Sequence, residues 1–287
     1  MILIDGRKIR EEILEEVKKE VAELSFTPVF CDVLVGENKA SIQYIQMKKK
    51  NAESAGIDFH QANFPASIST EKLIEEINII NKIPRMCGII IQLPLPEHID
   101  RQKVLDSISP ELDVDCLGAI RSKKFYNNYN DEDIGPPAAL SSMVVLDSLK
   151  LDLKNKKIIV LGQGILVGTP VTALLHYRNL SPTIVTDKTE DKEKIIKEAD
   201  VIISGIGKGK YIDGGMIKEG AVLIDAGTSE SEGGPPGARA GIVGDVDLES
   251  VKGVASYVSQ VPGGVGPVTI AILLSNVLKV AKKLKNV

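Results

Sequence analysis

Residues 158–168 read Ile-Ile-Val-Leu-Gly-Gln-Gly-Ile-Leu-Val-Gly, and this stretch decides the fold of the second half of the chain. A short apolar run stops at Gly162, Gly164 follows two residues later, and Gly168 opens a segment with helical spacing. Glycine permits the tight turn and a close backbone approach to a pyrophosphate, and the start of a helix offers unpaired N–H groups and a partial positive charge. The spacing is GxGxxxG rather than GxGxxG, so the motif alone fits either a nucleotide site or an ordinary glycine-rich turn.

The segments that follow place this motif in an expected βαβ unit. A helix opens at Gly168, and a second apolar strand over 183–186 ends at Asp187. An acid at the tip of the second strand can hydrogen-bond the hydroxyls of an adenosine ribose, and it would repel a 2′-phosphate. The alternative is that Asp187 caps the next helix, which we expect over 191–198.

Composition limits the classes to which the chain can belong. Its 287 residues suit one large or two medium domains, and 43% hydrophobic with 26% charged residues is ordinary for a globular protein. A net charge of −4 provides no basic field for nucleic acid or an anionic membrane. Cys31, Cys87 and Cys116 lack metal-ligand spacing and suggest a reducing compartment. We see no signal peptide and no apolar run long enough to span a bilayer, and we therefore expect a soluble cytoplasmic protein without a metal site.

An alternation of helices and strands also runs through the first half of the chain. The elements expected there are a helix that Asp5 caps, a strand near 28–35, helices over 39–55 and 70–82, and a buried strand over 87–93 that Pro94 ends. The polar segment 122–136 is the expected domain boundary. Apolar strands near 201–205 and 221–227 continue the second half, and the last helix, near 267–285, has a wide apolar face that we expect to pack back on the first domain.

Three groups of side chains in the first half could carry chemistry. Tyr44 and Lys48 are four residues apart on one expected helix, so they share a face, although a solvated lysine beside a half-buried tyrosine would show the same spacing. Gln92 ends an apolar strand at its carboxyl tip, where open α/β sheets bind ligands, and it would equally serve as a structural cap for the proline turn that follows. Asp113 and Asp115 are two residues apart in an expected extended loop and would point the same way, or they would cap a turn or a helix.

Several short segments, spread over nearly the whole chain, occur in a specific order. The most specific are Gly-Ile-Ile-Ile-Gln-Leu-Pro-Leu-Pro over 88–96 and Val-Pro-Gly-Gly-Val-Gly-Pro-Val-Thr over 261–269. The others are Val-Gly-Glu-Asn-Lys-Ala-Ser-Ile-Gln-Tyr over 35–44 with Lys48, Asp-Val-Asp over 113–115, Val-Gly-Thr-Pro over 167–170 and Gly-Asp-Val-Asp over 244–247. In this order they resemble the methylenetetrahydrofolate dehydrogenase/cyclohydrolase family, the bifunctional FolD-type folate enzymes.

The resemblance implies an α/β fold of two domains that carries out two reactions. It implies a catalytic folate-binding domain over 1–135, completed by the C-terminal helix over 267–287, and a Rossmann-like NAD(P)-binding domain over 136–266. In this family a hydride passes from 5,10-methylenetetrahydrofolate to nicotinamide, and water then converts the methenyl product into 10-formyltetrahydrofolate. The implied partners are tetrahydrofolate derivatives and a second copy of the chain in a homodimer.

The resemblance also implies roles for single residues. The residue matching Lys48 is the general acid/base, the one matching Tyr44 stacks on the folate rings, the one matching Gln92 hydrogen-bonds the lysine, and the one matching Asp115 binds the pterin edge. Gln92 can accept a hydrogen bond from Lys48 and hold it without an ion pair that would keep it charged. Lys48→Met should then abolish water addition while the protein stays folded. The further substrate-binding residues that the resemblance implies are Pro262, Gly263 and Gly264.

The expected cofactor is NAD or NADP. The residues expected to bind it are Gly162, Gln163, Gly164, Ile165, Gly168, Asp187, Gly205 and Thr228. The family usually has arginine and serine where this chain has Gln163 and Asp187, and those two residues hold the 2′-phosphate of NADP. An amide in place of a cation and an anion in place of a hydroxyl both act against that phosphate, so we expect a preference for NAD.

Two further departures from the family pattern leave three hypotheses open. Residues 112–116 read Leu-Asp-Val-Asp-Cys and residues 136–141 read Pro-Pro-Ala-Ala-Leu-Ser, where the family usually has Lys-Asp-Val-Asp-Gly and Pro-Cys-Thr-Pro-x-Gly. The first hypothesis is a bifunctional dehydrogenase/cyclohydrolase. The second is an enzyme that keeps one of the two steps, and the third is a non-catalytic folate- or nucleotide-binding relative.

Overall fold

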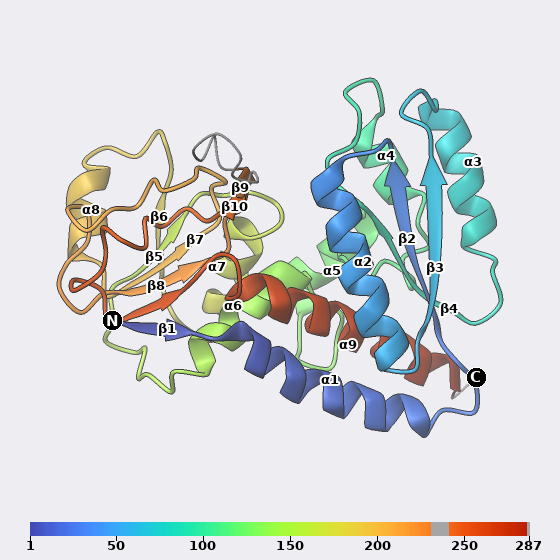
Figure 1. Cartoon of the computed structure of the whole chain (residues 1–287), viewed down its shortest axis with the longest axis horizontal. Coiled ribbons are helices and arrows are strands. Elements are labelled where there is room, and N and C mark those ends of the chain that lie inside the picture. The colour runs from blue at the N-terminus through green and yellow to red at the C-terminus, as the bar shows by residue number, and fades with distance from the viewer. Residues whose placement is uncertain (231–240, 286–287) are drawn as a thin grey trace. The chain divides into compact units, whose positions relative to one another are not determined.

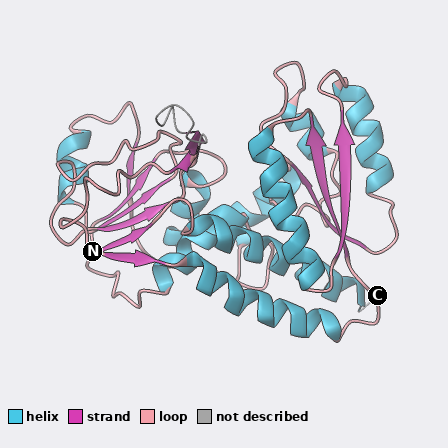
Figure 2. Cartoon of the chain, viewed as in Figure 1, coloured by secondary structure: helices cyan, strands magenta, loops and turns pink. Residues whose placement is uncertain are grey.

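The chain folds into two compact units, each built around a parallel sheet (Figure 1). The structure is a computed structural model that describes residues 1–230 and 241–285. The six-stranded unit comprises Met1–Arg10 and Ala138–Thr269, and the three-stranded unit comprises Glu11–Pro137 and Ile270–Val287. Helices and strands alternate along both units (Figure 2), which confirms the expected two-domain α/β class.

The six-stranded unit holds a sheet with the order β1-β11-β8-β7-β5-β6, and each neighbouring pair is parallel. Its strands are β1 (Ile2–Ile4), β5 (Ile158–Leu161), β6 (Thr183–Val185), β7 (Val201–Ser204), β8 (Val222–Asp225) and β11 (Tyr257–Ser259). The helices here are α6 (Pro137–Asp147), α7 (Gly168–Tyr177) and α8 (Lys192–Glu198), and a small antiparallel pair joins β9 (Ser229–Glu230) to β10 (Ile242–Val243). Every residue of β5, β7 and β8 is buried, as expected for parallel strands covered on both faces.

Strand β1 belongs to the six-stranded sheet, where it pairs with β11 along Ile2–Ile4. From the sequence, no strand is expected in this segment, and the segment is expected in the N-terminal domain. In the structure, residues Met1–Arg10 group with the six-stranded unit. The physical reason is backbone pairing across more than two hundred residues, which three residues of β1 cannot reveal by their own pattern.

The three-stranded unit contains a parallel sheet with the order β3-β2-β4. Its strands are β2 (Val29–Val35), β3 (Asp58–Phe64) and β4 (Met86–Ile91), and its helices include α2 (Lys39–Ser54), α3 (Thr70–Ile80), α4 (Arg101–Asp106) and α5 (Ala119–Asn128). Helix α1 (Gly6–Ala22) begins in the first ten residues and buries Val17 and Val21 in this unit, as its four-residue repeat predicts. The polar segment 122–136 does not form a plain linker, because α5 covers its first part and lies within this unit.

Helix α9 (Val265–Lys285) confirms the expected return of the C-terminus to the first domain. Its residues Leu274 and Val277 are fully buried in the core of the three-stranded unit. Gly88 of β4 makes this packing possible, since a Cβ there would lie 2.8 Å from Val277 Cγ2 and 3.0 Å from Val114 Cγ1. The close packing of helix on strand therefore depends on the missing side chain.

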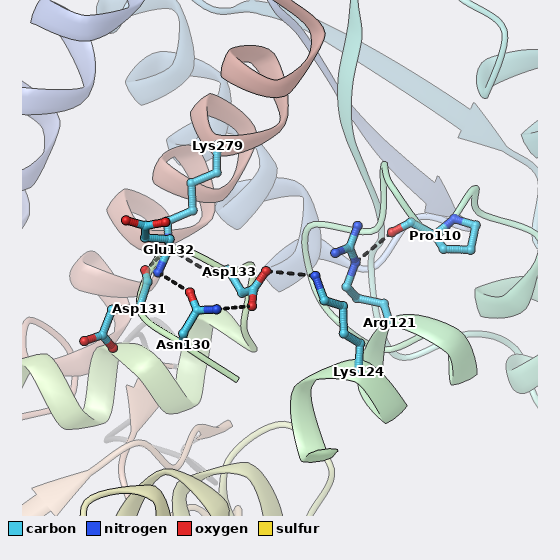
Figure 3. A network of polar contacts seen from close by, with 8 residues as sticks. All are labelled: Pro110, Arg121, Lys124, Asn130, Asp131, Glu132, Asp133 and Lys279. Atoms are coloured by element: carbon cyan, nitrogen blue, oxygen red, sulfur yellow. Dashed lines mark hydrogen bonds and ion pairs between the residues drawn. The ribbon is translucent and has the colours of Figure 1, made fainter. Parts of the chain in front are cut away.

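Two polar residues of α9 fix it to the loops around it. Asn276 donates hydrogen bonds to the carbonyl oxygens of Val114 (3.0 Å) and Gly135 (2.9 Å). Lys279 donates to the carbonyl oxygens of Asp131 and Asp133, both at 2.8 Å, and Figure 3 shows this lysine reaching the acidic loop. Burial lowers the pKa of Lys279. Figure 3 also shows Asp133 linked to Lys124, and Arg121 linked to Pro110.

One helix in the described part of the chain, α9, is long and apolar enough to cross a membrane by length and composition. Its most apolar window of 18 residues has a mean hydropathy of 1.4, so the expectation that no apolar run is long enough to span a bilayer is wrong by length and composition. The apolar residues serve another purpose here, because 61% of the most apolar window is buried inside the protein. A core helix that is apolar over most of its circumference passes the same test as a membrane span.

Candidate active site

Lys48 is the centre of the polar group in the three-stranded unit. Its side chain is 1% exposed, and its Nζ donates a 2.8 Å hydrogen bond to Gln92 Oε1. The Nζ also lies 5.0 Å from the centroid of the Tyr44 ring, one turn earlier on α2. Helix α2 and the end of β4 thus bring Tyr44, Lys48 and Gln92 together, and Lys48 is not a solvated lysine.

Asp32 is a third partner of Lys48, and it is not among the site residues expected from the sequence. Its Oδ2 lies 2.5 Å from Lys48 Nζ, and the side chain is 0% exposed in the centre of β2. Gln92 adds no charge beside Lys48, as expected, but Asp32 forms an ion pair with Lys48 that was not expected from the sequence. The available signal was a single acid inside the otherwise apolar strand Val29–Val35. Burial raises the pKa of Asp32, and the Lys48 ammonium opposes that rise.

Asp113 and Asp115 occupy different environments although they are only two residues apart. Asp113 is buried, and its carboxylate accepts hydrogen bonds from the N–H groups of Cys116 and Gly118, both at 2.8 Å. The turn-stabilising alternative is thus correct for Asp113. Asp115 is half-buried, and burial raises its pKa to about 7, with a further rise from Asp113 and an opposing effect of Lys48. The electrostatic link between Lys48 and Asp115 connects this carboxyl group to the same site.

Tyr44 is held neutral by its surroundings. Burial raises the pKa of its hydroxyl, and the negative charges of Asp115 and Asp32 raise it further. The ring therefore presents an uncharged aromatic face beside the ammonium of Lys48. Such a face suits stacking on a flat heterocycle.

The glycine loop of the six-stranded unit has the geometry that the motif predicts. Strand β5 ends at Leu161, Gly162 has a φ of +90°, and α7 begins at Gly168. A side chain at Gly168 would collide with the carbonyl of Gly162, so this pair needs glycine for chain packing. A Cβ at Gly164 would meet no described atom closer than 4.0 Å. The loop thus leaves open space at Gly164, as a cradle for a diphosphate requires.

The side chains expected to select the cofactor lie in two settings. Gln163 is half-buried, and its Nε2 donates to the Gly162 carbonyl (2.9 Å) and to Thr172 Oγ1 (3.1 Å). Asp187 is exposed just beyond β6. It does not cap α8, because Asp191 is the N-cap residue of that helix. The helix-capping alternative for Asp187 is therefore wrong.

The other expected cofactor residues lie at strand ends or on the surface of the same unit. Gly205 follows β7, and a Cβ there would lie 2.7 Å from Val167 Cβ. Asp245 shapes the loop that follows Gly205, because its carboxylate accepts hydrogen bonds from the N–H groups of Ile206 (2.8 Å) and Lys208 (2.9 Å). Surface positions are occupied by Ile165, which is 45% exposed, and by Thr228.

The segment Pro262-Gly263-Gly264 follows β11 in the six-stranded unit. The Val261–Pro262 peptide bond is cis, and Gly263 has a φ of +115°. The Gly6 N–H donates a 2.9 Å hydrogen bond to the Gly263 carbonyl, and a side chain at Gly6 would collide with Gly264. These glycines therefore have at least one structural role, which is the close approach of the chain at Gly6.

A search of residues 1–230 and 241–285 finds no group of three or more His, Cys, Asp or Glu side chains placed to hold a metal ion. The charged group around Lys48 includes two carboxyl groups, those of Asp32 and Asp115, with the amide of Gln92. A lysine with acidic neighbours suits proton transfer to and from a bound ligand.

Comparison with known proteins identifies both halves of the chain. Residues 4–115 match the tetrahydrofolate dehydrogenase/cyclohydrolase catalytic domain, and residues 136–285 match the NAD(P)-binding domain of the same family. The "Bifunctional protein FolD" of Bacillus licheniformis is 39% identical over 285 residues, with 98% of this chain and 97% of that protein covered. The FolD of Nautilia profundicola is 38% identical, with 98% of each chain covered.

Solved structures show the same likeness. The FolD methylenetetrahydrofolate dehydrogenase-cyclohydrolase of Trypanosoma brucei, complexed with NADP and an inhibitor, has a TM-score of 0.92 at 33% identity. The match covers 99% of this chain and 98% of that one. The bifunctional FolD of Campylobacter jejuni has a TM-score of 0.91 at 33% identity, with 99% of each chain covered.

Proposed function

Because this chain belongs to the tetrahydrofolate dehydrogenase/cyclohydrolase family, we propose that it oxidises 5,10-methylenetetrahydrofolate with NAD(P)+ and hydrolyses the methenyl product to 10-formyltetrahydrofolate. The observation that carries this proposal is the buried Lys48, bonded to Gln92 and lying beside the Tyr44 ring. A protein that only binds folate has no need of a lysine removed from water in this way, since burying an ammonium is unfavourable.

Each side chain of the Lys48 group has a proposed role. Lys48 is the general acid/base, and Gln92 orients it by accepting its hydrogen bond. Tyr44 stacks on the pterin, and the carboxylate of Asp115 accepts hydrogen bonds from the pterin N–H donors. We also assign Pro262, Gly263 and Gly264 to substrate binding. The three-stranded unit, with α9, is then the folate-binding domain.

The hydrolysis step needs a group that both takes and returns protons. Water adds its oxygen to the methenyl carbon and loses one proton. The bond from that carbon to N5 then breaks, the hydroxyl proton leaves as the formyl group forms, and N5 gains a proton. Lys48 is placed to accept and donate these protons, since its Nζ is held at a fixed position by Asp32 and Gln92.

The six-stranded unit is the proposed dinucleotide-binding domain. The turn at Gly162, the open space at Gly164 and the start of α7 at Gly168 would hold the diphosphate. Additional contacts are assigned to Gln163, Ile165, Asp187, Gly205 and Thr228. When bound, the nicotinamide accepts a hydride from the methylene carbon of the folate.

We expect NAD rather than NADP to be the preferred cofactor. Asp187 is exposed beyond β6 and would repel a 2′-phosphate, and Gln163 donates its amide hydrogens within its own loop and α7. Each charge-assisted hydrogen bond that NADP would lack is worth about 1.5–3 kcal/mol, or roughly ten- to a hundredfold in kcat/KM. Asp187→Ser should narrow the preference, whereas the matched change Asp191→Ser should leave it unchanged. A wild-type kcat/KM that favours NADP would contradict this expectation.

Parallel assays on 5,10-methylenetetrahydrofolate with NAD or NADP test the two activities, with reduced nicotinamide and the methenyl absorbance followed together. Reduced nicotinamide without accumulation of the methenyl compound supports a bifunctional enzyme. Accumulation of the methenyl compound indicates a dehydrogenase alone. If neither cofactor is reduced, hydrolysis of methenyltetrahydrofolate is measured directly, and a further negative result would favour the binding-protein hypothesis.

The proposal extends to the assembly and location of the protein. We expect a homodimer formed through the second domain, in the cytoplasm, without nucleic-acid or membrane partners. Size-exclusion chromatography with light scattering tests the dimer, since a monomer at micromolar concentration would contradict it.

A further inference from the structure

Asp32 is a charged side chain in a strand that is otherwise apolar. All seven residues of β2 are buried, and β2 is the central strand of its sheet. Asp32 pairs in register with Gln61 of β3 and Ile90 of β4, and its side chain has no exposed surface. A carboxylate in such a place is unfavourable unless another group compensates its charge.

Lys48 is the group that compensates it. The distance from Lys48 Nζ to Asp32 Oδ2 is 2.5 Å. Within the described residues, no backbone N–H or hydroxyl group donates a hydrogen bond to either oxygen of Asp32. The contrast with Asp113 is direct, since that buried carboxylate accepts from several backbone N–H groups. In the described part of the chain, Asp32 therefore depends on Lys48 alone for its charge balance.

The two acceptors around Lys48 act on it differently. Gln92 is neutral, so it fixes the position of the nitrogen in either protonation state. Asp32 is an anion, and an opposite charge at this distance favours the protonated form of an amine. The chain therefore contains one residue that orients Lys48 and a second that opposes the loss of its proton.

Three other titratable groups act on this pair. Tyr44 faces it from α2, Cys31 precedes Asp32 on β2, and Asp115 lies in the segment beyond β4. Burial raises the pKa of Tyr44 and of Cys31, so both are neutral near pH 7. Asp115, with a pKa of about 7, is the other acid that carries negative charge in this range. Among these four titratable groups of the described residues, Asp32 is the one that forms an ion pair with the ammonium.

We propose that Asp32 is a positioning residue that holds Lys48 in its charged form and thereby sets the lower limit of the pH range in which the enzyme hydrolyses its substrate. The inference rests on the proposed function, because Lys48 must be neutral before it can take a proton from water. It adds to the Lys48–Gln92 arrangement a residue that acts on the charge of Lys48 as well as on its position.

The test is the pH dependence of methenyltetrahydrofolate hydrolysis by Asp32→Asn, corrected for the uncatalysed rate. Without the carboxylate the neutral amine forms more easily, so the acidic limb of the kcat profile should move to lower pH by at least one unit, with KM nearly unchanged. Val277→Ala is the matched control, because it weakens the core of the same unit without changing a charge. An Asp32→Asn profile in the wild-type position, with kcat merely reduced, would overturn the proposal.

A second measurement decides the case if Asp32→Asn does not fold. In protein labelled with ¹³Cγ-aspartate, the Asp32 carboxyl signal is identified by its absence from the double variant Asp32→Leu/Lys48→Met. The proposal requires the titration midpoint of Asp32 to rise by at least one pH unit in Lys48→Met, and an unchanged midpoint would overturn it. This measurement needs no substrate, so a wild-type protein without hydrolase activity would refute the proposed function and leave the charge coupling to be decided by the spectra.

Discussion

Replacing Lys48 by methionine should destabilise the protein in a manner that depends on pH. The side chains of Lys48 and Asp32 are 1% and 0% exposed, so the variant leaves Asp32 as a buried carboxylate without a counter-charge. Removing one partner of a buried ion pair typically costs about 3–5 kcal/mol. The sequence predicts that this variant stays folded. From the structure we expect it to fold but to have a lower free energy of unfolding than the wild type.

The loss of unfolding free energy in Lys48→Met is smaller at pH values where Asp32 is protonated, because the buried carboxyl group then carries no charge. Burial already raises the pKa of Asp32, and removal of Lys48 takes away the charge that opposes the rise. A carboxyl group whose pKa is higher in the folded than in the unfolded state contributes most to stability at pH values below its unfolded-state pKa, which is near 3.9. This contribution is lost as the pH rises through the folded-state pKa. Holding the proton costs about 1.36 kcal/mol per pH unit above 3.9, which limits the loss to about 1.5 kcal/mol at pH 5.

Urea unfolding of the wild type and Lys48→Met at pH 5 and pH 8 provides the assay. We expect the difference in unfolding free energy to be about 1.5 kcal/mol at pH 5 and about 3–5 kcal/mol at pH 8. The double variant Lys48→Met/Asp32→Leu removes both charges and should recover most of the loss at pH 8. Equal losses at the two pH values would refute the reasoning, because they would mean that Asp32 is not left as an unpaired charge.

Three further predictions concern other parts of the structure. Gly88→Ala should lower the unfolding free energy by about 1–3 kcal/mol, because its Cβ would lie 2.8 Å from Val277 Cγ2. Adding Val277→Ala to this variant should recover part of the loss. If the losses of the two single variants simply add in urea unfolding, the packing argument is contradicted. The dissociation constant for tetrahydrofolate, measured by titration calorimetry, should rise as pH falls below about 7, because the Asp115 carboxyl, with its pKa of about 7, then loses its charge. Asp115→Asn should bind tetrahydrofolate weakly at every pH. If this variant keeps the wild-type pH dependence, Asp115 is not the source of that dependence. Asn276→Ala should lower the unfolding free energy by about 1–3 kcal/mol, since it removes two hydrogen bonds of 3.0 and 2.9 Å to buried carbonyl groups. A change below about 0.5 kcal/mol in urea unfolding would show that these bonds contribute little.

Local pattern was sufficient for much of the fold because the elements involved are continuous in sequence. The strand that ends at Gly162 and the helix that starts at Gly168 follow from apolar periodicity and glycine spacing, and the structure has them as β5 and α7. The shared face of Tyr44 and Lys48 follows from helical geometry in the same way.

Polar side chains were harder to assign, because their roles depend on which groups meet in space. Asp113 and Asp115 cannot be told apart in the sequence Asp-Val-Asp. In the structure, Asp113 accepts hydrogen bonds from backbone N–H groups, whereas the pKa of Asp115 is raised to about 7. The sequence allows Asp187 to be either a ribose contact or a helix cap, and the position of Asp191 at the start of α8 excludes the cap.

The sequence by itself determined the parallel α/β class, the glycine loop and the helical pairing of Tyr44 with Lys48, because each is encoded by neighbouring residues and regular periodicity. Only the tertiary structure decided that β1 pairs with β11, that α9 packs closely against Gly88, and that Asp32 forms an ion pair with Lys48. These three features join residues far apart in the chain. Backbone hydrogen bonds, van der Waals contact and Coulomb attraction act over a few ångströms of space, whatever the separation in sequence.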